Sequence, residues 1–258
     1  MYKTEGSLFK QLEILKESYN VQGIKAEFEA EGSSYRDVNR LSRVCSKLDV
    51  KLFLKIGGPE AVRDIKDSLE LGVSGLIAPM IESKFAAKKF IDAYRKIYQD
   101  KPSYTSLNIE TKIGVENIKE IIEFSAGSID SITIGRSDLT GSFFNENLNP
   151  DSSFIFQLIE KVAPIIHSNK MSLTVGGGVT CETISKIKSD FPSLKDLILK
   201  LETRKVIFYT DDLFDRDDSI RQALKFEELY ILSKKDFSDM YIDSEISRLT
   251  ELSRRVER

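Results

Sequence analysis

The chain has 258 residues, of which 41% are hydrophobic and 31% are charged, so it is long and apolar enough for one large α/β domain. Its 38 basic and 41 acidic residues nearly balance, which argues against a nucleic-acid partner. It has no apolar run of membrane length, no signal peptide, and too few cysteines for a disulfide framework or a structural zinc cluster. We therefore expect a cytoplasmic protein with no membrane partner.

Helix-like and strand-like segments alternate along the chain. Apolar residues that recur with a 3.6-residue period, such as Leu8, Leu12 and Leu15, predict helices, and short apolar runs between them predict strands. The predicted helices are 7–19, 35–48, one that begins at Pro59, 83–98, 115–125, 151–168 and 181–190. The predicted strands are 23–30, 51–56, 75–78, 106–110, 131–134, 172–175 and 196–201.

This repeated strand–helix rhythm predicts a parallel sheet, and the length favours a closed (β/α)₈ TIM barrel over an open doubly wound sheet. An eighth strand must come from the first six residues or from Arg204–Tyr209. After about residue 212 the pattern changes, and two helices are predicted at 217–233 and 237–256. We expect a single TIM-barrel domain over residues 1–258. Its helical tail, from about 213 to 258, would pack on the barrel or reach a neighbouring subunit.

Four predicted strands have one apolar face and one charged face. Since helices cover the outside of such a barrel, the charged faces are expected to meet inside it. Buried charges are costly unless they are paired or bound to a metal. Lysine–glutamate pairs that only stabilise the barrel and an active site at its C-terminal mouth both remain open. The polar residues on these faces are Lys25, Glu27, Glu29, Glu31, Lys55, Asn108, Glu110, Lys200 and Glu202.

Two carboxylates are well placed for a metal ion. Glu110 ends one predicted strand, and Asp138 follows the next strand along the chain. Neighbouring strands lie about 4.8 Å apart, so both carboxylates could reach one cation. Two carboxylates completed by water and substrate oxygens suit Mg²⁺, whereas a single histidine makes zinc a poorer choice. That histidine, His167, is expected to be structural or on the surface.

Five fragments, in order, resemble the HpcH/HpaI aldolase and citrate lyase beta-chain family of the phosphoenolpyruvate/pyruvate barrel superfamily. The resemblance runs from about Gly23 to Ser142 and is weaker beyond. The fragments are GIKAEFE (23–29), FLKI (53–56), LGVSGLIAPMIE (71–82), NIET with GVEN (108–117) and IGRSDLTGS (134–142).

The resemblance implies a barrel that binds Mg²⁺ or Mn²⁺ through Glu110 and Asp138 and acts on a 2-oxo acid such as pyruvate. Asn108 occupies the place of a glutamine that contacts substrate in this family, and the backbone from Gly135 through Arg136 and Ser137 to Asp138 would hold the substrate carboxylate. The metal would stabilise the enolate that forms as a carbon–carbon bond breaks or forms. The resemblance also implies a homo-oligomer.

Two positions depart from the family pattern. Lys55 stands where the family has an arginine that braces the keto oxygen, so the charge is kept but the bidentate fork is lost. Ala30 stands where the aldolases have a histidine base, although the citrate-lyase branch also lacks that histidine. Glu29 or Glu31 would replace the base if burial or like charge raised its pKa, and the alternation of the strand favours Glu29.

Two later features could bind a distal anion. Gly176, Gly177 and Gly178 follow a late strand, where backbone amides can hold phosphate, although the same glycines suit a tight turn. Arg204 follows the last clear strand and would bind a phosphate or carboxylate, unless it only pairs with Glu202.

The function predicted first is a divalent-metal-dependent carbon–carbon lyase of the class II aldolase type, with a 2-oxo acid and an aldehyde as substrates. A citryl- or malyl-CoA-type lyase is the second hypothesis. A non-catalytic barrel used for binding or assembly is the third, and the departures at Ala30 and Lys55 motivate it.

Overall fold

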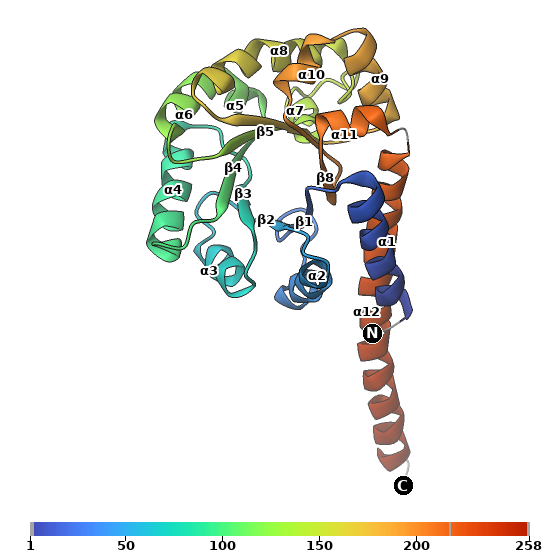
Figure 1. The fold of residues 1–258 in the computed structure, drawn as a ribbon. Coiled ribbons are helices and arrows are strands. Elements are labelled where there is room, and N and C mark those ends of the chain that lie inside the picture. The colour runs from blue at the N-terminus through green and yellow to red at the C-terminus, as the bar shows by residue number, and fades with distance from the viewer. Residues whose placement is uncertain (1–2, 217, 257–258) are drawn as a thin grey trace.

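The computed structural model describes residues 3–216 and 218–256, and its centre is a closed barrel of eight strands in chain order (Figure 1). Strands β1 to β7 are parallel neighbours, as in the pairs Ile24–Leu52 and Leu107–Ile132. The predicted barrel is therefore confirmed. The strands are β1 (Gly23–Glu27), β2 (Leu52–Lys55), β3 (Gly75–Ala78), β4 (Tyr104–Ile109), β5 (Ser131–Gly135), β6 (Ser172–Gly176), β7 (Lys200–Glu202) and β8 (Val206–Tyr209).

The eighth strand departs from a regular (β/α)₈ barrel because it runs antiparallel to both of its neighbours, β7 and β1. Only residues 203–205 connect it to β7, which is too short for the crossover that a parallel strand needs. Of the two predicted sources for this strand, Arg204–Tyr209 is correct. Residues 3–6 belong to the first helix instead, and residues 1–2 lie outside the described part of the chain.

Helices surround the barrel (Figure 1). The predicted helix 115–125 is two helices that meet at Asn117, and residues 193–197, part of which was predicted as strand, are helical. Two short helices, at 136–141 and 210–215, were not predicted. The helices are α1 (Lys3–Tyr19), α2 (Tyr35–Lys47), α3 (Val62–Glu70), α4 (Lys84–Tyr98), α5 (Lys112–Glu116), α6 (Ile118–Ser125), α7 (Arg136–Gly141), α8 (Ser153–Ser168), α9 (Cys181–Ser189), α10 (Ser193–Leu197), α11 (Thr210–Asp215) and α12 (Ser219–Val256).

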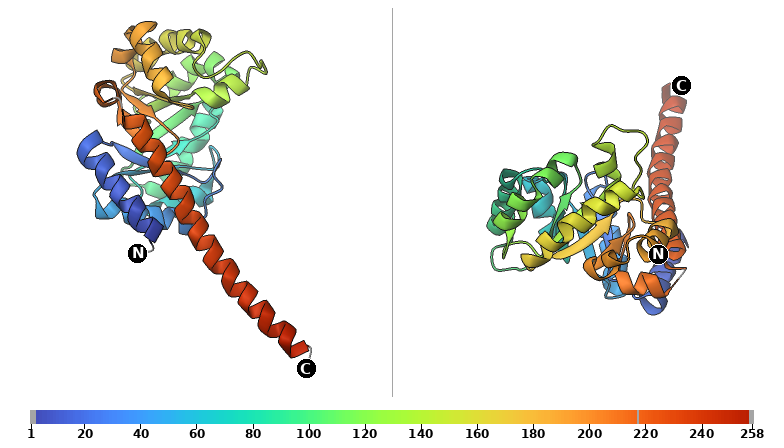
Figure 2. Two further views of the ribbon diagram at one scale, coloured as in Figure 1. Left: turned by 90° about the vertical axis from the view of Figure 1, so that its right-hand side faces the viewer. Right: turned by 90° about the horizontal axis from the view of Figure 1, so that it is seen from above.

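The two predicted C-terminal helices are one continuous helix, α12, which corrects the expectation of a break near residue 235. The segment between them, residues 234–236, is Lys-Lys-Asp and has neither glycine nor proline, so the helical hydrogen bonds continue through it. Asp217, where the first of these helices was predicted to begin, lies outside the described residues. Helix α12 packs along α1 and then projects away from the barrel (Figure 2).

The barrel interior changes character from one end to the other. Phe53, Ile77 and Ile207 pack with Tyr104 toward the N-terminal ends of the strands. Above them, Ser106 and Thr133 hydroxyls lie 2.9 Å apart, and charged side chains occupy the C-terminal mouth. The apolar strand faces pack outward against the helices. Across both described ranges, no helix is long and apolar enough to cross a bilayer.

Candidate active site

A cavity of about 370 Å³ opens at the C-terminal mouth of the barrel. Most of the residues predicted from sequence line it, which places them together although they come from different strands. Three of the predicted residues, Glu29, Arg136 and Gly176, are not part of its lining. The predicted residues that line the cavity are Lys55, Asn108, Glu110, Gly135, Ser137, Asp138, Gly177, Gly178 and Arg204.

Lys25 lies at the centre of one buried charge cluster. Its ammonium donates to Glu202 Oε1 at 2.7 Å and lies 3.5 Å from Glu27 Oε1, and all three side chains are buried. Burial alone would lower the pKa of Lys25, but attraction by Glu202 and Glu27 outweighs burial and raises it. The predicted charge pairing inside the barrel is therefore present.

Lys55 lies at the centre of a second cluster. Its ammonium is 2.9 Å from Glu29 Oε2 and 3.3 Å from Glu110 Oε2. Burial opposes the charge, but Glu110 and Glu29 raise the pKa of Lys55 above its ordinary value. Lys25 and Lys55 thus stay protonated at neutral pH, which argues against Schiff-base chemistry because that chemistry needs a neutral amine.

Glu110 is held from three sides. Its Oε1 accepts the backbone N–H of Met80 at 2.9 Å, and its Oε2 accepts Asn108 Nδ2 at 3.0 Å and Lys55 Nζ at 3.3 Å. The amide of Asn108 is thereby oriented with Oδ1 turned away from Glu110. That oxygen is buried without a hydrogen-bond partner in the described part of the chain, and Asn108 lines the cavity.

The donor set suits a hard cation. Glu110, Asp138 and the unpartnered Asn108 oxygen all belong to the cavity and supply only oxygen atoms, which Mg²⁺ prefers. The carboxylate of Asp138 has no hydrogen bond or ion pair to any residue in the described ranges, so it is free to bind. Over those same ranges, no cluster of three or more His, Cys, Asp or Glu side chains forms a metal cage. A cation here would therefore need the amide and outside oxygens.

Glycines make room for the mouth carboxylates. A Cβ on Gly135 would lie 2.7 Å from Glu110 Oε2, and one on Gly176 would lie 2.8 Å from Glu202 Oε1. Gly177 has a φ of +79°, and a Cβ there would lie 2.5 Å from the amide nitrogen of Ser137. The turn at 176–178 therefore presses against the start of α7, which supports the tight-turn interpretation of these glycines.

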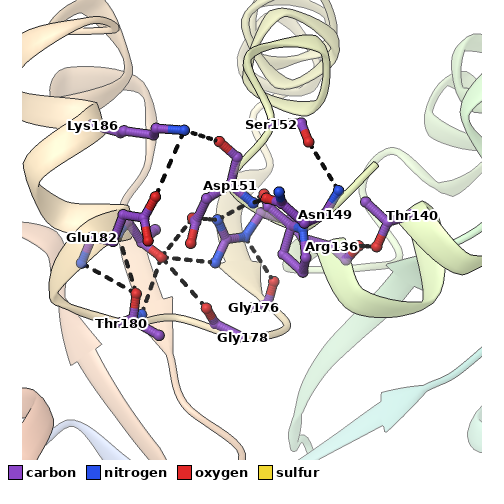
Figure 3. A network of polar contacts seen from close by, with 12 residues as sticks. Arg136, Thr140, Asn149, Asp151, Ser152, Gly176, Gly178, Thr180, Glu182 and Lys186 are labelled. Atoms are coloured by element: carbon purple, nitrogen blue, oxygen red, sulfur yellow. Dashed lines mark hydrogen bonds and ion pairs between the residues drawn. The ribbon is translucent and has the colours of Figure 1, made fainter. Parts of the chain in front are cut away.

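The side chain of Arg136 does not line the cavity, whereas the predicted substrate contact at this position was through its backbone. Its guanidinium is fully buried and donates to Asp151 Oδ1 at 2.7 Å, to Pro150 O at 3.1 Å and to Gly176 O at 3.3 Å (Figure 3). Thr183 also binds Asp151 Oδ1 at 2.7 Å. Arg136 thus ties α7 to β6 and to the segment before α8, and it sets the position of the neighbouring Ser137 and Asp138.

The segment after β1 does not continue the strand, which corrects the alternation expected for Glu29. β1 ends at Glu27, and residues 28–31 form a bend and a turn. Glu29 reaches the edge of the site through Lys55, and Glu31 pairs with the buried Lys205. Both carboxylates are thus neutralised by lysines, whereas Ala30 lines the cavity. His167 lies far away and contacts Leu197 O at 2.7 Å, as expected of a structural histidine.

One cavity carboxylate was not predicted from sequence. Glu227 of α12 lines the mouth together with Arg204 and Glu202. Its position depends on how a helix distant in sequence packs against the barrel, and no local motif around residue 227 signals that packing.

The model of the HpcH/HpaI aldolase/citrate lyase family matches residues 48–156, from just before β2 into α8. Through this segment the chain is similar to the HpcH/HpaI aldolase/citrate lyase family. The match contains Lys55, Asn108, Glu110 and Asp138, so the family resemblance in the sequence is confirmed.

Several solved structures share the fold. An HpcH/HpaI aldolase from Desulfitobacterium hafniense is 13% identical over 76% of this chain and 81% of its own, with a TM-score of 0.61. A family protein from Burkholderia cenocepacia is 13% identical over 86% and 89%, with a TM-score of 0.60. A variant of the citrate synthase SbnG is 16% identical over 70% and 77%, with a TM-score of 0.55. The comparison with curated proteins finds no match.

Proposed function

We propose that this protein is a divalent-metal-dependent carbon–carbon lyase of the aldolase type that makes or cleaves a 2-oxo acid through an enolate. The observation that carries the proposal is the oxygen set at the barrel mouth. Asp138 and the buried Asn108 Oδ1 are without partners in the described ranges, and both share one cavity with Glu110. Buried polar atoms are normally satisfied, so the unpartnered oxygen of Asn108 indicates a bound ligand, and the exposed carboxylate of Asp138 is open to the same ligand.

Glu110, Asp138 and Asn108 would hold Mg²⁺ or Mn²⁺. When bound, such an ion supplies Lewis-acid polarisation of the carboxylate and keto oxygens of the 2-oxo acid. Lys55 lies beside Glu110 and remains protonated, so it adds a fixed positive charge where negative charge develops on the substrate oxygen.

Residues around the rim would position the substrate. Gly135 and Ser137 line the cavity at the start of α7, and their backbone would hold the substrate carboxylate. Gly177 and Gly178 lie against the start of α7, and Arg204 follows β7 on the same rim; a distal carboxylate or phosphate of the aldehyde portion would bind to these residues. We also propose a cytoplasmic homo-oligomer, because every residue from 238 to 256 of α12 is exposed.

A non-catalytic barrel is the second candidate. One observation favours it: Lys55 already neutralises Glu110, so the carboxylate is satisfied without a metal. A CoA-thioester lyase would share the metal chemistry and differ in the substrate that it accepts.

Two measurements test the proposal. Mn²⁺ is titrated into the wild type, Glu110→Gln and the control Glu116→Gln, whose side chain is exposed on α5. We expect weaker binding in Glu110→Gln alone, and equal affinity in all three proteins would disprove the site. Exchange of the pyruvate methyl protons in D₂O with Mn²⁺ present, followed by NMR, then reports enolate formation. Absence of exchange across the pH range would favour the CoA-lyase or non-catalytic alternative.

A further inference from the structure

The mouth cavity has five carboxylates, and their partners divide them into two groups. Lys25 neutralises Glu27 and Glu202, and Lys55 neutralises Glu110. The carboxylates of Asp138 and Glu227 have no hydrogen bond or ion pair to any residue that the structure describes. Asp138 belongs to the oxygen set proposed for the metal, so Glu227 is the cavity carboxylate left without an assigned task.

Glu227 is held firmly at the mouth by its neighbours on α12. Phe226 and Tyr230 are buried against the barrel, and Lys205 lies over the Tyr230 ring at 4.2 Å from its centroid. Lys205 itself pairs with Glu31 from the turn after β1. These contacts fix the part of α12 from which Glu227 reaches the cavity. The later part of the same helix, residues 238–256, is exposed.

The surroundings of Glu227 favour a carboxylate that exchanges protons. Its side chain is half-buried, and burial raises its pKa above the ordinary value. Four charged groups from the other elements packed here also act on it: Arg204 and Lys205 lower its pKa, whereas Glu31 and Glu27 raise it. The net effect is a raised pKa, which moves the carboxylate toward neutral pH, where a general base works best.

Glu29 and Glu31 are less suited to this task. Each is ion-paired with a buried lysine, Lys55 and Lys205 respectively, so its carboxylate is already engaged by a partner. Ala30 lies between these two residues in the sequence and lines the cavity, but its side chain has no group that can carry a proton.

We propose that Glu227 is the proton-transfer group of this site, a role that rests on the function proposed above. With pyruvate, the Glu227 carboxylate takes a proton from the methyl carbon. The electron pair of that C–H bond becomes the carbon–carbon double bond of the enolate, and the former keto oxygen takes the negative charge. A deuteron acquired from D₂O returns to the same carbon, which completes one exchange. The C-terminal helix thus supplies the base that the segment after β1 lacks.

The test compares Glu227→Gln with a matched control, Glu228→Gln. Glu228 is the next residue on α12, is exposed and does not line the cavity. Exchange of pyruvate methyl protons is measured in the full-length proteins with Mn²⁺ from pH 5 to pH 9, and urea unfolding verifies that each variant is folded. Removing a general base typically costs about 10²–10⁴-fold in rate. We expect that loss in Glu227→Gln, together with loss of the rise in rate through the raised pKa, and a wild-type profile in Glu228→Gln.

The outcomes separate the two proposals. Exchange in the wild type and equal exchange in Glu227→Gln would overturn the role of Glu227 and leave the proposed function standing. A slower Glu227→Gln variant that keeps the wild-type pH profile would indicate a positioning role and would also overturn the assignment. No exchange in the wild type would overturn the proposed function, and the role of Glu227 in it would fall as well.

Discussion

Gly135→Ala should disable the site while leaving the barrel folded. The Cβ of alanine would lie 2.7 Å from Glu110 Oε2 and 2.8 Å from Glu110 Cβ, whereas ordinary contacts begin at 3.4 Å. Glu110 must therefore withdraw, and its bonds to Met80 N, Asn108 Nδ2 and Lys55 Nζ must lengthen or break. The φ of Gly135 is −87°, which alanine adopts freely, so the substitution isolates this crowding.

The magnitude follows from the crowding. Overpacking in a barrel interior costs about 1–3 kcal/mol of unfolding free energy, and a displacement of about 1 Å at a catalytic group can cost about 10²-fold in rate. Urea unfolding and pyruvate proton exchange measure the two effects. Gly141→Ala is the control, because a Cβ there meets no atom within 4 Å. A folded Gly135→Ala protein with wild-type exchange would refute the assignment of Glu110 to the site.

Three further predictions concern buried charge and the tail. Arg136→Met should lower the unfolding free energy measured in urea by about 3–5 kcal/mol, because Asp151 loses its buried partner. Arg248→Ala is the control at an exposed ion pair and should cost less than about 1 kcal/mol. Equal costs in the two variants would contradict the buried network. Native Glu227 binds its proton more tightly than the unfolded chain does. The unfolding free energy of the wild type should therefore fall relative to that of Glu227→Gln as pH rises from 4.5 through the raised native pKa. A difference in unfolding free energy between the two proteins that does not change with pH would contradict the raised pKa. Deleting residues 242–258 should leave the urea midpoint unchanged but reduce the number of subunits per particle, as calculated from the mass measured by light scattering. An unchanged number of subunits would exclude this segment from oligomer contacts.

The sequence predicted the barrel and most of its mouth because those features depend on local patterns. Strand alternation places Lys55, Asn108 and Glu110 inside the barrel, as expected, and the order of strands brings Gly135 and Asp138 beside them. Periodicity alone cannot specify strand direction, so the antiparallel orientation of β8 was not predicted.

The contacts of individual side chains were harder to predict than the strand face on which each residue lies. Arg136 stands in a family motif but lies in a fully buried network with Asp151, because it points away from the mouth at the start of α7. Alternation also predicted a strand through Glu29, whereas β1 ends two residues earlier and Glu29 reaches Lys55 from the turn that follows. Glu227 could not be found from sequence, because its place in the cavity depends on tertiary packing of α12.

The most direct test of the central claim is a crystal structure of the protein soaked with Mn²⁺ and oxalate, a planar mimic of the pyruvate enolate. We expect a manganese anomalous peak at the barrel mouth, ligated by Glu110, Asp138 and Asn108 Oδ1, with oxalate on the same ion. A mouth without manganese at saturating concentration, with Lys55 still bound to Glu110, would contradict the metal-dependent account of this site.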